Sequence, residues 1–219
     1  MTQTTSLGDL FPLLVLVLAV GLLPFVAVMV TSYTKIVVVL GLLRNALGVQ
    51  QVPPTMVLNG IAIIVSIYIM APVGMAAYDK VTADGLQTNS VEQVTQIAKA
   101  LADPVRDFLE KHAQMREREF FVKSASAIWP AERAQAVRSD DLIILAPAFT
   151  LTELTEAFRT GFLVYLAFIV VDLVIANILL AMGLSQVTPT QISIPLKLLL
   201  FVVLDGWSVL VHGLVLGYR

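Results

Sequence analysis

The chain has 219 residues, of which 58% are hydrophobic and 14% charged, with a mean hydropathy of +0.85 and a net charge of −2. Soluble globular proteins carry about 25% charged residues, so this composition indicates an integral membrane protein or a very apolar assembly subunit. The slightly acidic balance, with no basic face, argues against nucleic acid as a partner. The absence of cysteine excludes disulfides, a thiol nucleophile and a thiolate metal site.

The first apolar segment is predicted to be one long helix that starts near Leu10, bends at Pro24 and continues to about Leu47. Proline removes a helix hydrogen bond, which accounts for the bend. Residues 36–43 are too apolar for a solvated loop, although one span followed by a loop is the simpler alternative. Gly48 is a suitable residue to end the helix.

A second apolar segment, residues 56–77, follows a turn that the two prolines at 53 and 54 predict. Pro72 and Gly74 mark the place where this helix is expected to bend or end. Together the two segments form a predicted N-terminal apolar helical hairpin, residues 1–78.

Nearly all the charge of the chain lies in the next stretch, predicted to be a polar helical domain over residues 79–149. Ser90-Val91-Glu92-Gln93 has the pattern of a capping box that opens a helix. Asp103-Pro104 is expected to break or restart this helix, and a second helix is expected to run to about Ser124.

The C-terminal unit, residues 150–219, is predicted to be a long helix followed by an apolar hairpin. Thr150-Leu151-Thr152-Glu153 has the pattern of a second capping box. The helix that it opens continues into an apolar arm to residue 184, and a turn at 185–189 leads to a second arm, 192–216. The predicted fold is therefore all-α: a membrane or assembly subunit with two bent apolar helical hairpins and an inserted helical polar domain.

Three charged residues lie inside the two C-terminal arms: Asp172, Lys197 and Asp205. A charge at mid-membrane costs at least about 2.5–3.5 kcal/mol on insertion scales, so these side chains are expected to face protein or water. If the turn centres near residues 186–187, Lys197 lies about one helical turn from Asp172. We therefore expect Lys197 to pair with Asp172 or Asp205, within the subunit or between subunits; the alternative is a lysine that extends to the membrane interface.

Catalysis is not predicted. The two histidines are far apart and have no neighbouring ligand pattern, so no metal or cofactor is expected. Asp172 and Asp205 could form the carboxylate pair of an intramembrane protease, but a structural ion pair with Lys197 explains them equally well.

The charges of the short loops predict the topology. Lys35 and Arg44 flank the first turn, so the positive-inside rule places both short turns in the cytoplasm and both termini, with the polar domain, in the periplasm.

Several ordered blocks of this sequence resemble the SctR/FliP family of type III secretion systems, and the injectisome branch more than the flagellar one. The blocks are Thr31-Ser32-Tyr33, Leu43-Arg44-Asn45-Ala46-Leu47-Gly48, Gln50-Gln51-Val52-Pro53-Pro54, Val57-Leu58-Asn59-Gly60-Ile61-Ala62, Pro147-Ala148-Phe149, Glu153-Leu154, Ala157-Phe158, Gly161-Phe162, Val171-Asp172-Leu173-Val174, Ile194-Pro195-Leu196-Lys197-Leu198 and Leu204-Asp205-Gly206-Trp207.

The resemblance implies a subunit of the export gate in the bacterial inner membrane. Family members form a helical ring of about five copies with one SctT and with SctS, near SctU and SctV, and conduct unfolded secreted proteins without catalysing a reaction. It implies that Asp172, Lys197 and Asp205 are buried between subunits. A self-sufficient transporter or channel for a small substrate is the alternative, since broken helices and intramembrane charges also fit it.

The turn after Gly183 departs from the flagellar pattern. Flagellar relatives carry a methionine run here that is thought to seal the channel, whereas this chain has Leu184, Ser185 and Gln186. A ring of these three residues is the candidate pore constriction, and a plain helix connector is the alternative. Ala167 stands where the family often has proline, so that arm is expected to be straighter.

Overall fold

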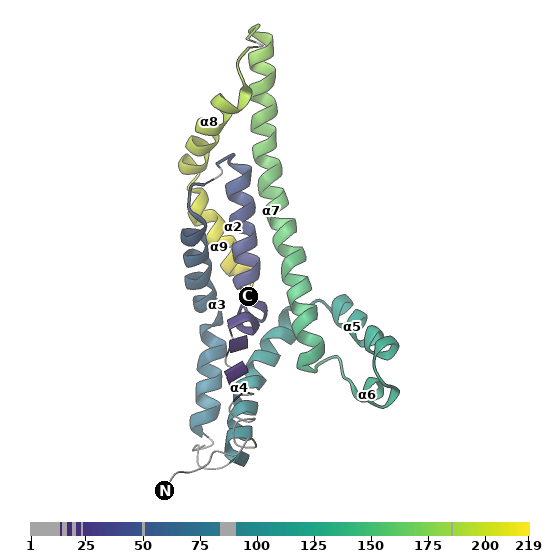
Figure 1. Ribbon diagram of the computed structural model, residues 1–219. Coiled ribbons are helices and arrows are strands. Elements are labelled where there is room, and N and C mark those ends of the chain that lie inside the picture. Colours follow the sequence, from purple (N-terminus) through teal and green to yellow (C-terminus); the bar gives the residue numbers. More distant parts are fainter. Residues whose placement is uncertain are drawn as a thin grey trace.

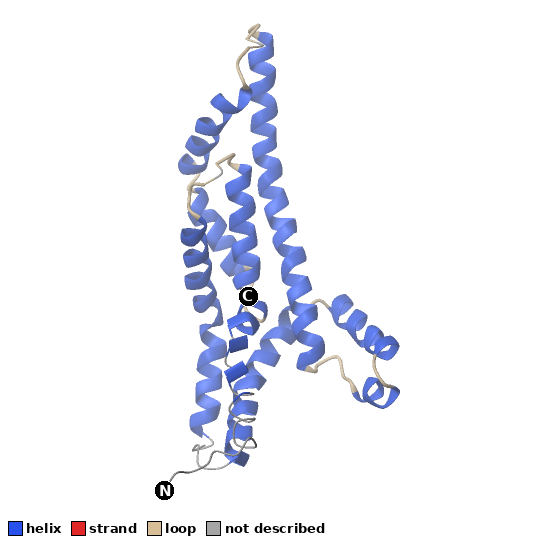
Figure 2. Ribbon diagram, viewed as in Figure 1, coloured by secondary structure: helices blue, strands red, loops and turns tan. Residues whose placement is uncertain are grey.

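The computed structural model describes residues 14, 17–18, 21–22, 24–49, 51–83, 91–184 and 186–219. Within these ranges the chain is almost entirely helical and contains no strand (Figure 2), which confirms the all-α prediction. The helices are α2 (Tyr33–Ala46), α3 (Thr55–Ala83), α4 (Val91–His112), α5 (Met115–Ile128), α6 (Ala131–Ala136), α7 (Leu142–Ala181), α8 (Pro189–Val203) and α9 (Gly206–Leu216). The molecule is elongated, and α5 and α6 form a short arm that projects from one side (Figure 1).

A turn at residues 30–32 separates the first helical stretch from α2. The prediction of a single helix that continues to about Leu47 is therefore wrong, and the predicted bend at Pro24 stays a prediction. Ser32 in the turn is fully buried, and its hydroxyl donates to Ser66 Oγ of α3 at 3.1 Å. A tertiary contact to a distant helix thus holds the place where α2 begins.

Four prolines of the described residues lie inside helices that continue through them: Pro72 in α3, Pro104 in α4, Pro147 in α7 and Pro195 in α8. The break predicted at Pro104 is wrong, and α3 runs past Pro72 to Ala83 instead of ending near it. Pro72 and Pro104 line the same cavity, where α3 and α4 pack against each other. This packing offsets the roughly 3 kcal/mol that an interior proline costs.

The break between the polar helices lies ten residues later than predicted, at residues 113–114. Its conformation is held by α7, because the Gln114 N–H donates to Thr152 Oγ1 at 3.1 Å. The hydroxyl of Thr152 in turn donates to Ala148 O at 2.8 Å, one helical turn back in α7.

Helix α7 begins at Leu142, so the predicted start at Thr150 is wrong. The hydroxyl of Thr150 donates to Ala146 O at 2.8 Å, the bond typical of a threonine in a helix interior. The capping box at Ser90 lies outside the described residues. Because α3 and α7 run through the expected boundaries near residues 78 and 149, the polar stretch is joined to both apolar units by continuous helices, and the three-domain division stays a prediction.

The core lies where α2, α3, α4 and α7 meet. One cluster joins α2 to α3 and α7 through Ile36, Val39, Leu40, Leu58, Ala62 and Ala157, and a second joins α4 to α7 through Phe108, Leu109, Leu145, Ala148 and Phe149. Gly161 allows α2 and α7 to approach closely, because a Cβ at this position would lie 2.9 Å from Leu42 Cβ. One face of the N-terminal half of α7 is thereby buried inside the chain.

Helices α3 and α7 are long and apolar enough to cross a membrane. The pair α8 and α9, bent by 62° at the break between them, forms a third such unit if it is counted as one span. Most of the first predicted segment lies outside the described residues, so the four-segment topology stays a prediction.

Candidate functional site

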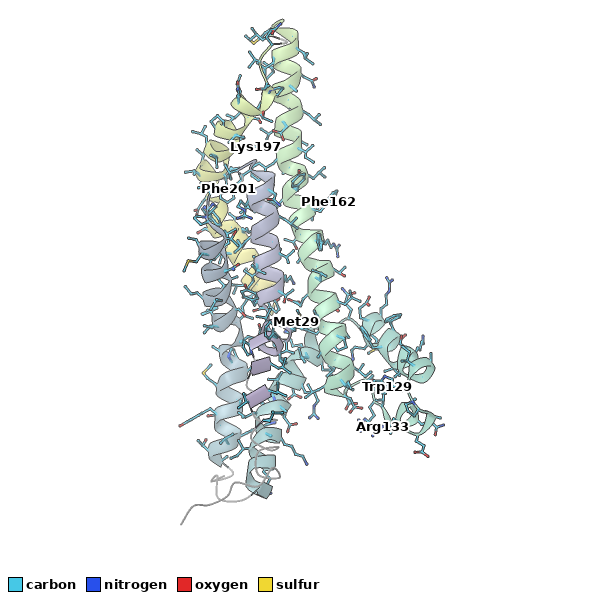
Figure 3. All side chains as sticks on the ribbon, viewed as in Figure 1. Met29, Trp129, Arg133, Phe162, Lys197 and Phe201 are labelled. Atoms are coloured by element: carbon cyan, nitrogen blue, oxygen red, sulfur yellow. The ribbon has the colours of Figure 1, made fainter. Side chains whose placement is uncertain are left out.

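A lysine buried between three helices forms the centre of the candidate site. Lys197 on α8 is only 4% exposed, and its Nζ donates to Asp172 Oδ2 of α7 at 2.6 Å and to Ala46 O of α2 at 3.1 Å. Figure 3 shows Lys197 between α8 and the neighbouring helices. One ammonium group thus ties α8 to α7 and satisfies a carbonyl at the end of α2, where the helix dipole is negative.

The C-terminal end of α2 has the form needed to receive α8. Gly48 follows the helix with a φ of +78°, the left-handed conformation that favours glycine, and so ends α2 as predicted. A Cβ at Gly48 would lie 3.0 Å from Ile194 Cγ1 of α8, so the missing side chain also makes room for that helix. Arg44 in the last turn of α2 donates to Thr55 Oγ1 at 2.9 Å, which holds the start of α3 nearby.

The three charged residues predicted to pair are not all together. Asp172 lies beside Lys197, and its Oδ1 is buried without a hydrogen-bond partner among the described residues. Asp205 is exposed in the break between α8 and α9, with a φ of +51°, and forms no ion pair within the described part of the chain. The next residue, Gly206, lies so close to the Phe201 ring that a Cβ there would overlap it, which fits this sharp bend.

The candidate constriction lies at one tip of the molecule, at the connection between α7 and α8 (Figure 1). The Leu184 N–H donates to Leu179 O and the Gly183 N–H to Leu180 O, both at 3.0 Å, and Gly183 has a φ of +72°. This is the Schellman arrangement that ends a helix. Leu184 and Gln186 are exposed, and Ser185 lies outside the described residues. No narrowing of a channel is defined by one chain, so the constriction stays a prediction.

A second buried charged cluster lies near the start of α2. Glu153 of α7 is 3% exposed, with Lys35 Nζ at 3.8 Å from its Oε1, and the Tyr218 hydroxyl donates to its Oε2. Lys35 Nζ also lies 4.8 Å from the centre of the Tyr218 ring. Burial, followed by the negative charge of Glu153, raises the pKa of Tyr218, so its hydroxyl stays protonated and remains a donor.

Sequence patterns did not reveal this cluster, because Glu153 also fits a capping box. The available signal was that Lys35 is a single charge next to an apolar run, which calls for a partner of opposite charge. Among the described residues, no group of three or more His, Cys, Asp or Glu could hold a metal ion. Both charged clusters join segments that are distant in the sequence.

The sequence matches the family model described as "FliP family" over residues 15–214, which is most of the chain. The chain belongs to the FliP family. The resemblance stated from the sequence blocks is thereby confirmed, and every residue of both charged clusters except Tyr218 lies within the matched range.

Relatives of this FliP-family chain carry names that refer to pathogenicity and secretion. "Pathogenicity-related ORF2" of Xanthomonas campestris pv. glycines is 61% identical over 99% of this chain and 100% of its own length. "Hypersensitivity response secretion protein HrcR" of Ralstonia nicotianae is 64% identical, over 94% and 96%. "Yop proteins translocation protein R" of Yersinia pestis is 52% identical, over 97% and 98%. These names support the predicted placement in the injectisome branch.

The FliP-family chain leaves a large apolar surface uncovered on the C-terminal half of α7. Phe162, the first residue after the close approach at Gly161, is 62% exposed, and Figure 3 shows it on the outer side of the helix. Further along the same half, large apolar residues more than half exposed are Leu163, Val170, Leu173, Val174, Ile178 and Leu180. On α8 and beside it, Leu199, Val202, Val203 and Leu204 are exposed to a similar degree. Soluble monomers rarely expose such a continuous patch, so lipid or protein covers this surface.

Proposed function

We propose that this protein is a core subunit of a type III secretion export gate. In this proposal about five copies form a ring with one SctT-type and with SctS-type subunits, near SctU- and SctV-type proteins, in the bacterial inner membrane. The ring is the entry pore for unfolded secreted proteins, and the polar segment, residues 79–149, faces the periplasm. The subunit builds and lines the pore and catalyses no reaction.

One observation supports this proposal above the others: the C-terminal half of α7 is apolar and exposed. In a FliP-family chain whose relatives are named as secretion proteins, such a surface is a candidate contact with other subunits. The same half carries Asp172, whose buried Oδ1 has no partner within the described chain. A carboxylate oxygen left in this way costs free energy unless a donor reaches it, and a neighbouring subunit can supply one. A subunit packed against α7 would cover the apolar surface and satisfy Asp172 together.

Native mass spectrometry of the detergent-purified chain, expressed alone and with SctS- and SctT-type proteins, tests this function. We expect a mixed complex with several copies of this chain and one SctT-type subunit. Phe162→Asp is expected to abolish the complex, because it places a charge in the proposed contact. Ser126→Asp on the exposed surface of α5 introduces the same charge and should leave the complex intact. A stable small homo-oligomer that ignores both partners would favour the transporter for a small substrate.

The position of the constriction has its own test, which uses the absence of natural cysteine. Single variants Leu184→Cys and Gln186→Cys are expected to form disulfide-linked dimers on mild oxidation of the assembled complex, because the tips of neighbouring copies would converge on one axis. Ser126→Cys serves as the control and should remain monomeric. If the tip variants stay monomeric in an intact complex, these residues do not surround a pore.

A further inference from the structure

A cavity of about 390 Å³ lies between α3 and α4, away from both charged clusters of the candidate site except at Tyr218. Its floor consists of apolar residues of α3, among them Ile69, Val73 and Ala76. Its rim consists of polar side chains from both helices, among them Lys80 of α3 and Lys111 of α4. The cavity thus joins an apolar surface to two amines.

The charge around this cavity is positive on balance. Lys80 Nζ lies 3.5 Å from Asp103, but Asp103 also pairs with Arg106 at 3.1 Å, so one carboxylate is shared by two cations. Lys111 forms no ion pair within the described part of the chain, and Asp107 is the one carboxylate that lines the cavity. The charged residues that line the cavity are thus the two lysines and one aspartate, which leaves a net charge of about one positive.

His112 also lines this cavity, next to Lys111. Burial, followed by the positive charges of Lys111 and Lys35, lowers the pKa of His112 from its ordinary value. Its ring lies 5.3 Å from that of Tyr218 and 4.6 Å from that of Phe108, so it is held in place against aromatic neighbours. The donors that this cavity offers to an anion are the amines of Lys80 and Lys111.

The position of the cavity along α3 favours a lipid over a small free anion. No charged residue occurs in α3 from Thr55 to Tyr78, and Lys80 is the first cation after that stretch. Lysines at the end of a membrane-length apolar stretch lie at the depth of lipid headgroups. Met75 and Tyr78 do not line the cavity, but both are more than half exposed, so apolar surface continues around this part of α3.

We propose that the cavity between α3 and α4 binds an anionic phospholipid. Its phosphate lies between Lys80 and Lys111, and its acyl chains lie along the exposed apolar side of α3. Such a lipid would hold the polar helix α4 at the membrane surface. This lipid binding is separate from the proposed export function. It can be measured on the full chain whether or not the chain assembles with partners.

Native mass spectrometry of the full chain in detergent, titrated with phosphatidylglycerol or phosphatidylcholine, tests the proposal. We expect retention of phosphatidylglycerol at concentrations where phosphatidylcholine is lost. The double variant Lys80→Ala/Lys111→Ala is expected to weaken this retention on the order of tenfold, since each basic residue near a lipid surface contributes attraction. Lys99→Ala/Lys123→Ala removes the same charge from exposed positions and should bind as the unchanged chain does.

Two further measurements make the result decisive. Circular dichroism checks that the double variant keeps its helices, and Lys111→Glu, which breaks no ion pair of the described structure, replaces it if it does not. Inorganic phosphate in millimolar excess should fail to displace the lipid, because it lacks acyl chains. Equal retention of both lipids, unchanged binding by the lysine variants, or displacement by phosphate would each overturn the proposal.

Discussion

The two halves of α7 differ in composition and in burial, and the more apolar half is the one that is less buried within the chain. From Leu142 to Gly161 the helix buries Ile144, Leu145, Ala148, Phe149, Thr152, Glu153, Ala157 and Gly161, whereas from Phe162 to Ala181 only Ile175 and Leu179 are buried. The first half contacts α2, α4 and α5 of its own chain, and the second half packs against the end of α2 and against α8. An apolar sequence alone therefore does not say whether a surface is buried within its own chain or is left for lipid or another subunit to cover.

The largest expected effect comes from comparing one phenylalanine in each half of α7. Phe149→Ala removes a side chain that is fully buried beside Phe108, with ring centres 5.6 Å apart, and should cost about 3–5 kcal/mol of stability. Phe162→Ala, on the exposed half, should leave the thermal unfolding of the isolated chain within about 0.5 kcal/mol. Thermal denaturation in detergent measures both. Equal losses would mean that the exposed half is already covered within the chain.

Breaking the Lys197 junction should have the next largest effect. Lys197→Ala leaves Asp172 and Ala46 O without their donor and should cost about 2–3 kcal/mol, less than for a fully buried pair because the Asp172 side chain is 41% exposed. Replacing both partners, as Lys197→Met/Asp172→Leu, should recover most of the loss. A double-mutant cycle on thermal stability measures the coupling. A Lys197→Ala variant with unchanged stability would contradict the role of this pair in joining α8 to α7.

The boundary between the two halves can be tested at Gly161. Gly161→Ala places a methyl group against Leu42 and should separate α2 from α7, at a cost of about 1–3 kcal/mol. Gly60→Ala in α3 has open space around its Cβ and should be neutral or slightly stabilising, since alanine favours a helix. If the two variants lose stability equally, helix propensity and not the close approach of α2 and α7 controls this site.

The smallest expected effect is a pH dependence of the stability, caused by His112 of α4, the helix that packs against the first half of α7. Its folded pKa lies below the ordinary value of 6.5, so the unfolded chain binds more protons below that pH. Stability should be unaffected well above pH 6.5 and should fall as the pH is lowered through 6.5 toward the folded pKa. His112→Gln should remove this part of the pH slope in thermal denaturation measured from pH 7.5 to 5.5. An unchanged slope would assign it to carboxylates instead.

What the sequence by itself determined was the class of the protein, its family and several local features. Apolar runs of about 20 residues, few charges and the ordered blocks were sufficient for an all-α membrane or assembly subunit of the FliP family. Gly48 ended its helix as predicted, because a left-handed backbone favours glycine. Counting residues from the turn placed Lys197 about one helical turn from Asp172, and the structure has their atoms 2.6 Å apart.

Only the tertiary structure decided where the helices break and which charges meet. Pro104 and Pro147 remain inside helices because packing from other elements offsets a lost hydrogen bond. The chain instead leaves the helical conformation at residues 113–114, where Gln114 bonds to Thr152, 38 positions away in the sequence. Glu153 likewise bonds to Tyr218, 65 positions away in the sequence, because tertiary packing brings the two residues together. Local sequence encodes the preference of a segment, and long-range packing, which pairs residues distant in the chain, determines which preferences are overridden.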